Sequence, residues 1–324
     1  MPCNKPLLAV ISDQETKSGK KKYIPIGRYD RFVAEDYPDG IKIPCGKCAG
    51  CRAQKSREWA DRMILELDHS KKAVFLTLTY NDDHVPAIMQ ITTGQTELTL
   101  QKRDLQLFMK RMRKRFKDKE LRFYAVGEYG SNTQRPHYHM ILYGLGLDDF
   151  KDLKIKGSNE LGQIYYKSDW LAEEVWKLGF CLLSEVSWKT CAYVARYVKK
   201  KDMGLVTDEY VERMRQPEFS VMSRDPGIGM YYPLEHKDYL SKSVYYFSDQ
   251  DDIVQVRFPS VFLNYLEKND KKRYLELKEE RKKYANDYEL AKLYQTDLTS
   301  MELDEIADTK INFTEEVIDF YRGL

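Results

Sequence analysis

The 324-residue sequence has no apolar run near the ~20 residues that a membrane-spanning helix needs. Its first residues lack the basic-then-apolar order of a secretory signal peptide, and no Gly-x-x-x-x-Gly-Lys-Ser/Thr phosphate loop occurs. Cysteine is scarce, and three of the six cysteines crowd into positions 45–51, which argues against a disulfide framework. These absences predict a cytoplasmic protein that has no membrane contact and no ATP-driven motor activity.

Charge is distributed unevenly along the chain, although the net charge is only +2. Residues 1–200 carry 35 Lys and Arg against 25 Asp and Glu, whereas residues 201–324 carry 18 against 26. The composition, 42% hydrophobic and 32% charged, is that of a globular protein with one large domain or two modest ones. A basic part joined to an acidic part suggests one half that binds a polyanion and another that contacts something else.

Histidine is also rare, and two of the five histidines stand one residue apart at the start of an apolar stretch. In a strand, His137 and His139 would share one face, while Tyr138 and Met140 would share the other. Two imidazoles aimed at one point suit a single divalent cation. Two half-exposed histidines on a sheet face would give the same pattern.

A carboxylate is expected beside this histidine pair. Residues 121–129 read as a strand, and residues 130–132 form a turn into the histidine strand, so the two strands should be antiparallel neighbours. Glu128 would then come close to His137 and His139. Two imidazoles and one carboxylate leave positions open for substrate oxygens, and we predict a Mg²⁺ or Mn²⁺ site here.

The cysteine block contains two overlapping Cys-x-x-Cys steps, formed by Cys45, Cys48 and Cys51. Glycines between them let the backbone turn tightly around a metal. Three thiolates are one short of a closed tetrahedral site, and Cys3 is the natural fourth. We prefer a structural Zn²⁺ site, with reduced, buried cysteines at the start of a helix as the alternative.

A strongly basic helix is predicted over residues 100–119. Its apolar stripe consists of Leu105, Phe108, Met109, Met112 and Phe116. The rest of its surface is almost entirely positive, and since like charges repel, phosphates would stabilise it. The ordinary alternative is a solvated face. We predict DNA contacts by Arg111, Arg113, Lys114 and Arg115.

Residues 190–201 read as a helix on which Tyr193 and Tyr197 lie one turn apart, so both hydroxyls project from one face. With 24 tyrosines in the chain, two half-buried core aromatics are the alternative. A free phenol has a pKa of about 10, and a nearby cation or lysine favours the nucleophilic phenolate. Such a phenolate can attack a phosphodiester to leave a phosphotyrosine, which a second attack can rejoin without ATP. We predict catalytic roles for Tyr193, Tyr197 and Lys200, and a DNA contact by Arg196.

Four motifs in this order resemble the HUH-type endonucleases, and most closely the replication initiators of the gokushovirus branch of the small single-stranded DNA phages. They are a strand motif (75–80), a His-hydrophobic-His motif (136–142), a two-tyrosine motif (193–200) and the cysteine block (44–51). Residues 222–229 are a weaker fifth point. Initiators often have a lysine three residues after the attacking tyrosine. Lys200 stands at that position after Tyr197, whereas Arg196 stands there after Tyr193, which departs from the pattern.

The resemblance implies an α+β fold: a central antiparallel sheet flanked by helices, with a ferredoxin- or RRM-like HUH core and a mainly helical C-terminal part. We expect an N-terminal cysteine-containing segment (1–70), the endonuclease core (71–232) and an acidic C-terminal region (233–324). The implied activity is nicking and religation of single-stranded DNA at a replication origin for rolling-circle replication. The implied partners are the host helicase and DNA polymerase in the bacterial cytoplasm.

Two other readings remain open from the sequence. An HUH-type transposase or relaxase would use the same chemistry, although relaxases usually have a longer histidine cluster and many such transposases have one tyrosine. A non-catalytic, zinc-stabilised nucleic-acid-binding protein would account for the cysteines and the basic helix. It would leave the histidine pair and the tyrosine pair as coincidences.

Overall fold

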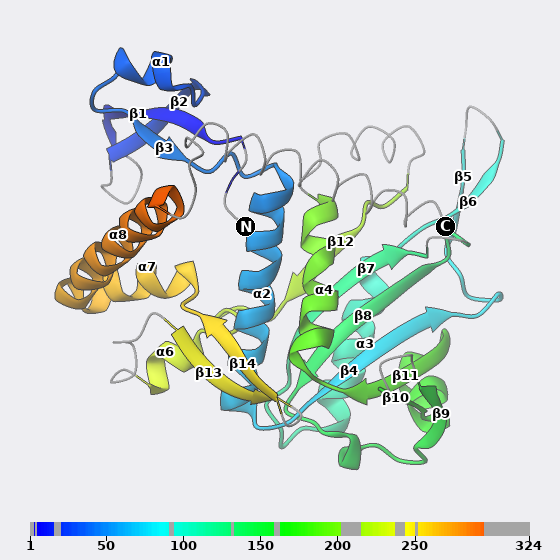
Figure 1. Cartoon of the computed structure of the whole chain (residues 1–324). Coiled ribbons are helices and arrows are strands. Elements are labelled where there is room, and N and C mark those ends of the chain that lie inside the picture. The colour runs from blue at the N-terminus through cyan, green and yellow to red at the C-terminus, as the bar shows by residue number, and fades with distance from the viewer. Residues whose placement is uncertain are drawn as a thin grey trace. The chain divides into compact units, whose positions relative to one another are not determined.

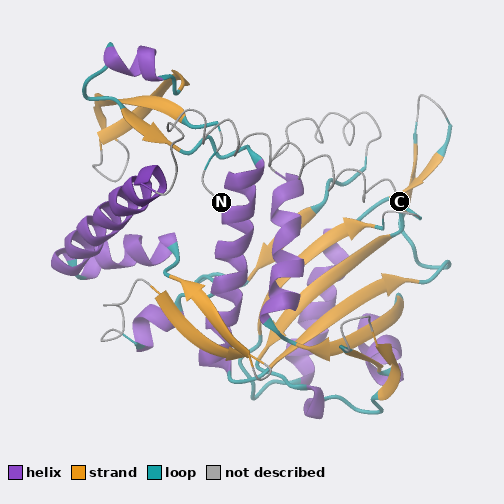
Figure 2. Ribbon diagram, in the orientation of Figure 1, coloured by secondary structure: helices purple, strands orange, loops and turns teal. Residues whose placement is uncertain are grey.

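Figures 1 and 2 show the computed structural model of the chain. It describes residues 3, 5–15, 21–90, 94–130, 133–158, 163–201, 215–236, 244–249 and 252–294. The chain divides into two compact units, Met1–Lys55 with Lys282–Leu324 and Ser56–Arg281, and each is treated by itself. The segments expected from the sequence, with limits near residues 70 and 232, stay a prediction. Within the described ranges, no helix has the length and apolar character needed to cross a membrane.

The larger unit is built on a seven-stranded sheet in which every neighbouring pair is antiparallel. From one edge to the other the strands are β12 (Phe219–Met222), β7 (Arg122–Tyr129), β8 (Pro136–Tyr143), β4 (Ala73–Tyr80), β11 (Gly179–Glu185), β10 (Ile164–Lys167) and β9 (Lys154–Ser158). With the helices that flank the sheet, this confirms the α+β class expected from the sequence.

Helices cover both faces of this sheet (Figures 1 and 2). On one face lie α2 (Ala49–Ser70) and α4 (Trp188–Lys201), and on the other α3 (Lys102–Arg115) and the short π-wound helix η2 (Leu171–Trp176). Along β8, Ile141 and Tyr143 pack against the α2–α4 side, whereas Tyr138, Met140 and Leu142 pack against the α3 side. Because strand side chains alternate, His137 and His139 belong to the α2–α4 face, as the sequence predicted.

Tyrosine hydroxyls on the α3 face fix the start of that helix. The Tyr138 hydroxyl accepts the Gln101 N–H at 2.9 Å, and the Tyr129 hydroxyl accepts the Leu100 N–H at 3.0 Å. The Tyr80 hydroxyl donates to Asp104 at 2.7 Å. These bonds satisfy helix N-terminal donors that would otherwise be buried without partners.

The segment 222–229, singled out in the sequence as a weak motif, is docked on α2 and β7. The carboxylate of Glu66 accepts the Gly229 N–H at 2.6 Å, and Arg122 donates to the Pro226 carbonyl at 2.7 Å. Glu66 and Arg122 also pair with each other, and both are buried. Gly229 has φ of +77°, a left-handed conformation that glycine adopts without strain. The segment therefore has a structural role.

One part of the chain differs from what its sequence pattern predicts. The stretch 145–168 reads as a loop, but it contains η1 (Leu147–Asp149), β9 and β10, and both strands are short and end in exposed or half-buried side chains.

The charged pattern of residues 268–293 predicts a long helix, and α8 (Lys271–Tyr294) confirms it. A separate helix, α7 (Ser260–Asn269), precedes α8. Asp270 lies between the two, and its carboxylate accepts the Arg273 N–H at 3.0 Å and caps α8.

The remaining elements form small groups. The smaller unit contains a sheet in the order β2-β1-β3 and a short helix: β1 (Leu7–Glu15), β2 (Lys21–Arg28), α1 (Arg31–Glu35) and β3 (Ile41–Ile43). The larger unit adds two hairpins and a short helix: β5 (Ala87–Met89) with β6 (Thr96–Leu98), β13 (Val244–Asp249) with β14 (Asp252–Arg257), and α6 (Tyr231–Glu235).

The buried pair of Glu66 and Arg122 gives a test of this packing. In Arg122→Met, Glu66 would stay buried without its partner, and we expect the free energy of unfolding in urea to fall by about 3–5 kcal/mol. Lys110→Met, on the exposed side of α3, is the control and should change it by less than about 0.5 kcal/mol. Equal effects of the two substitutions would contradict the assignment.

Candidate metal and tyrosine site

The register of three neighbouring strands assembles the site. Glu128 of β7 stands directly opposite His137 of β8, and Thr77 of β4 stands opposite His139. Glu128 Oε1 lies 2.7 Å from His137 Nε2 and 2.8 Å from His139 Nε2. The structure thus brings the three ligands expected from the sequence to one point, with Glu128 and His139 buried and His137 partly exposed.

The other nitrogen of each imidazole is held by the protein. His137 Nδ1 lies 3.1 Å from the Arg135 carbonyl, which only accepts, so Nδ1–H donates to it and Nε2 faces the Glu128 carboxylate. His139 Nδ1 lies 2.9 Å from Thr77 Oγ1, and the ring of Phe75 stacks on that of His139 with centroids 5.6 Å apart. Imidazoles oriented in this way present Nε2 to the cluster, as metal ligands do.

The electrostatics of the cluster follow from burial and mutual contact. Burial alone would raise the pKa of Glu128, but its hydrogen bonds to the two histidines outweigh burial and hold the pKa below the usual value. Burial would lower the pKa of His137, yet the bond to Glu128 raises it above normal. At His139 burial prevails and the pKa is lowered. A buried carboxylate beside two imidazole Nε2 atoms is a donor set that fits one divalent cation, which would replace the shared protons.

Tyr193 comes to this cluster from α4. Its Oη lies 3.3 Å from His139 Nε2, and its ring meets the His139 ring edge-on with centroids 5.1 Å apart. The start of α4 is fixed because Ser187 and Thr190 exchange backbone-to-hydroxyl bonds of 3.3 and 2.9 Å, a reciprocal cap that sets where the helix begins. Trp188 ties α4 to α2 through a 3.0 Å bond from its indole N–H to Asp61.

The other residues predicted on α4 are placed less completely. Arg196 is exposed. Tyr197 and Lys200 lie on the helical backbone of α4, but their side chains fall outside the described part of the structure.

Two residues beside the site were not found from the sequence. Thr77, which holds His139, would have required the register between β4 and β8. Glu218 is buried just before β12, where Phe219 pairs with Gly127, so Glu218 adjoins Glu128 on the same face. The negative charge of Glu218 contributes to the raised pKa of His137. The sequence offered one signal for Thr77, its place inside the strand motif 75–80, and none for Glu218.

The basic residues of α3 are not brought to the histidine cluster, because α3 covers the opposite face of the sheet. Arg111 donates to the carbonyls of Val175 and Trp176 at 2.8 and 3.1 Å, at the end of η2. Arg115 donates to the carbonyl and carboxylate of Glu174 at 3.0 and 2.9 Å. These two arginines therefore hold η2 in place, although the sequence suggested DNA contacts.

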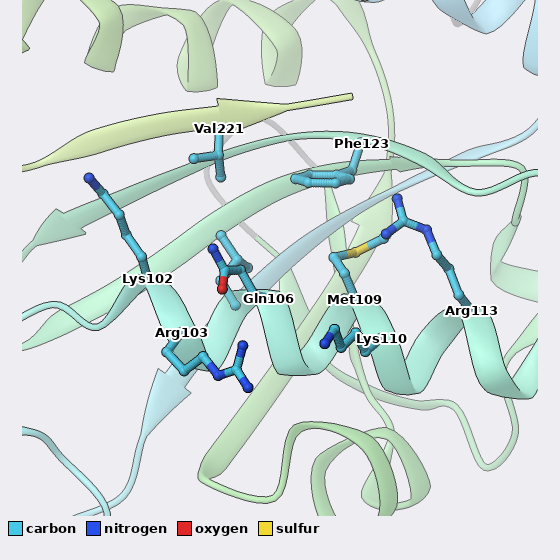
Figure 3. A pocket seen from close by; sticks show the side chains of 9 residues that line it. Lys102, Arg103, Gln106, Met109, Lys110, Arg113, Phe123 and Val221 are labelled. Atoms are coloured by element: carbon cyan, nitrogen blue, oxygen red, sulfur yellow. The ribbon is translucent and has the colours of Figure 1, made fainter. Parts of the chain in front are cut away.

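Arg113 and Lys114 remain exposed on α3. Arg113 borders an open cavity of about 370 Å³ between α3 and the edge of the sheet (Figure 3). Basic side chains and the ring of Phe123 line it, and the labelled residues are Lys102, Arg103, Gln106, Met109, Lys110, Arg113, Phe123 and Val221. This positive surface is separated from Tyr193 by the thickness of the sheet.

The predicted cysteine ligands also meet. Cys3, Cys45, Cys48 and Cys51 each offer a sulfur atom, and these atoms all lie within 4.8 Å of one another in the smaller unit.

Comparisons with known proteins agree with the motifs. The family described as "Replication-associated protein ORF2/G2P" matches residues 73–202, a range that contains β4, β7, β8 and α4. The "Replication-associated protein ORF2" of Spiroplasma virus 4 is 31% identical over 88% of this chain and 87% of its own length. The "Replication-associated protein VP4" of Bdellovibrio phage phiMH2K is 34% identical over 49% of this chain and 48% of its own.

A third relative, the "Replication-associated protein ORF4" of Chlamydia phage 1, is 32% identical over 49% of this chain and 38% of its own length. No solved structure matches the chain. The match to the Spiroplasma virus protein extends over most of both chains, and it confirms the resemblance to the gokushovirus-type initiators. The chain therefore belongs to the family of phage replication-associated proteins, as a replication initiator of the gokushovirus type.

Proposed function

We propose that the protein starts rolling-circle replication by nicking single-stranded viral DNA at an origin, with Tyr193 as the attacking nucleophile. One observation carries the proposal: the Tyr193 hydroxyl lies 3.3 Å from His139 Nε2, at a cluster of two imidazoles and a carboxylate. A nucleophile beside a cation site is what phosphoryl transfer from DNA requires. Family membership supports the biological role, and the geometry supports the chemistry.

In the proposed reaction, Glu128, His137 and His139 hold Mg²⁺ or Mn²⁺. The bound cation would supply Lewis-acid polarisation of the phosphoryl oxygens and favour the phenolate. Tyr193 Oη forms a bond to phosphorus as the bond from phosphorus to the 3′ oxygen breaks. The phenol loses its proton and the 3′ oxygen gains one, so the products are a 5′-phosphotyrosine and a free 3′-hydroxyl that can prime synthesis.

Religation follows from the same chemistry run in reverse. The phosphotyrosine keeps the energy of the ester, so a 3′-hydroxyl can attack it and close the DNA circle without ATP. Tyr197 stands four residues after Tyr193 on α4, one helical turn away. We propose that one tyrosine holds a strand end while the other cleaves again, and that Lys200 favours the phenolate of Tyr197.

The single-stranded DNA is proposed to reach the site along α4, where the exposed Arg196 would bind a phosphate. Arg113 and Lys114 on α3 would bind DNA at a separate surface. Removal of Arg111 or Arg115 would disturb η2 as well as any DNA contact. We further propose that the host helicase and DNA polymerase are partners and that the protein acts in the host cytoplasm.

The family match favours a replication initiator over a transposase or relaxase, which would share the chemistry. The alternative is a non-catalytic, zinc-stabilised nucleic-acid-binding protein. That function would not explain why Tyr193, His139 and Glu128 lie together. It remains an outcome of the first test below.

The first prediction concerns the nucleophile. With Mn²⁺ and a 5′- or 3′-labelled single-stranded origin oligonucleotide, we expect wild type to form a covalent adduct at the 5′ phosphate of the downstream fragment, so that only the 3′ label becomes linked to protein. Tyr193→Phe should lower the rate of adduct formation by about 10³-fold or more, because loss of a nucleophile leaves only binding and electrostatic contributions. Tyr197→Phe should still cleave but fail to transfer the strand. The measurement is a denaturing gel with single-turnover timing.

Tyr166→Phe, on β10 next to the edge of the sheet, is the matched control and should nick like wild type. An adduct that persists in Tyr193→Phe and disappears in Tyr197→Phe would reverse the assignment of the two tyrosines. Free 5′-phosphate ends without an adduct would indicate a hydrolytic nuclease. DNA binding without cleavage under either metal would favour the non-catalytic alternative.

The second prediction concerns the positioning of His139. Thr77→Val keeps the β-branched shape but removes the hydroxyl beside His139 Nδ1. Loss of such a partner typically weakens metal binding, and we expect Mn²⁺ affinity measured by calorimetry to fall about 10–100-fold. Thr77→Ser retains a hydroxyl and should bind nearly as wild type does. Equal Mn²⁺ affinity of the valine variant and wild type would show that Thr77 does not position the histidine.

A further inference from the structure

Cys3 meets the distant cysteine block, Cys45, Cys48 and Cys51, in the smaller unit. Cys3 precedes β1, Cys45 follows β3, and Cys48 and Cys51 stand at the start of α2. β1 and β3 are antiparallel, with Leu7 opposite Ile43, so the residues before β1 and those after β3 lie at the same end of the sheet. The strand pairing therefore carries Cys3 back to the cysteine block.

The distances between the sulfur atoms match a tetrahedral metal site. Cys45 Sγ lies 4.0 Å from Cys51 Sγ, and Cys48 Sγ lies 3.8 Å from Cys3 Sγ. A zinc ion with bonds of about 2.3 Å to four thiolates places those sulfurs about 3.8 Å apart. A disulfide would need about 2.05 Å, and none of the four cysteines forms one. The spacing fits a shared ion and excludes sulfur–sulfur bonds.

The backbone around the cluster is arranged to stabilise negative sulfur. The N–H of Cys45 donates to Cys3 Sγ at 3.2 Å, that of Cys48 to Cys45 Sγ at 3.3 Å, and that of Cys51 to Cys48 Sγ at 3.5 Å. Gly46 has φ of +76°, which allows the tight turn between the first two ligands of the block. The N-terminus of α2 adds its partial positive charge. Burial raises the pKa of Cys3 and Cys51, so these contacts offset part of the cost of buried thiolates and a bound cation would offset the rest.

The small sheet also has little else to hold it together. Among the described residues before α2, only Leu8 and Ala9 are fully buried hydrophobic side chains. β2 is exposed along its whole length, and its apolar residues Tyr23, Ile24 and Ile26 are exposed too. Among the described residues, the small sheet thus has few buried apolar side chains, and small folds of this kind are typically stabilised by a disulfide or a metal.

We propose that Cys3, Cys45, Cys48 and Cys51 bind one structural Zn²⁺ through four thiolates. Binding would release the four thiol protons and close the chain from residue 3 to residue 51, fastening the N-terminal end of β1 to the first turn of α2. The site is separate in composition from the Glu128 cluster, and the inference does not depend on the nicking activity.

The test uses the full-length chain purified under reducing conditions and dialysed against metal-free buffer. The background variant Glu128→Gln/His137→Ala removes two of the three candidate ligands at the Glu128 cluster. We expect one zinc per chain by elemental analysis, in wild type and in this background. X-ray absorption should show a shell of four sulfur atoms at about 2.3 Å. No zinc after supplementation, loss of zinc in the background variant, or a nitrogen and oxygen shell would overturn the proposal.

Substitutions identify the ligands. Cys48→Ser should lose the zinc, whereas Cys181→Ser and Cys191→Ser, which change buried cysteines outside the cluster, should keep it. Retention of full zinc content by Cys48→Ser would contradict the proposal. Since Cys48→Ser could act by unfolding the sheet, Cys3→His provides a second measurement. Its imidazole should keep Co²⁺ bound while weakening the thiolate-to-cobalt absorption, and an unchanged cobalt spectrum would exclude Cys3 as a ligand.

The nicking assay separates this inference from the proposed function. Zinc bound by the four cysteines in a chain that does not nick would leave the zinc proposal intact. Nicking by a chain that never binds zinc would refute the zinc proposal alone.

Discussion

The pairing of β8 with both of its neighbours is the constraint on which the candidate site depends. β7 presents Glu128 opposite His137, and β4 presents Thr77 opposite His139. A slip of one residue in either pairing would turn Glu128 or Thr77 to the other face of the sheet. The same slip would expose buried residues such as Ile141 and Tyr124, so hydrophobic packing fixes the register that the polar cluster needs.

The two faces of the sheet use tyrosine differently. On the α3 face, Tyr80, Tyr129 and Tyr138 have hydroxyls that are bonded to the start of the helix. Burial raises the pKa of Tyr138 to about 12, which makes its phenolate inaccessible at neutral pH. On the other face, Tyr193 points its hydroxyl at His139. Tyrosine content alone therefore says little about chemistry, since the surroundings of each hydroxyl decide its role.

Much of the fold was predictable because its central elements have strong periodicity. The alternation in β4 and β8 and the apolar stripe of α3 place these elements within a few residues of their observed bounds. The approach of Glu128 to the histidines was predictable too, since β7 and β8 are adjacent in sequence and joined by a turn. The short strands β9, β10 and β12, which lie at or next to the edges of the sheet, were missed because strands of four or five residues have too few alternations to recognise.

Long-range relations were not predictable from the sequence. Thr77 and His139 are separated by 62 residues, and nothing local in either strand fixes which residues face each other. The positive charges of α3 were visible, but not the carbonyl groups of η2 that Arg111 and Arg115 bind. A charge pattern shows that a helix face is basic, whereas only the tertiary structure shows which of its arginines are already used inside the protein.

A comparison of two buried carboxylates on the α2–α4 face, Glu66 and Glu128, shows why Glu128 fits a cation. Glu66 is fully compensated: its oxygens are met by the Arg122 guanidinium and the Gly229 N–H. Glu128 instead has one oxygen shared by two imidazoles whose Nδ1 atoms are already bound elsewhere. Hydrogen bonds from His137 and His139 hold the pKa of Glu128 below its usual value, so the carboxylate is compensated only through one oxygen and two imidazoles. A divalent cation at the same atoms would replace those protons and compensate the buried charge more fully, which is why this arrangement fits the proposed metal site.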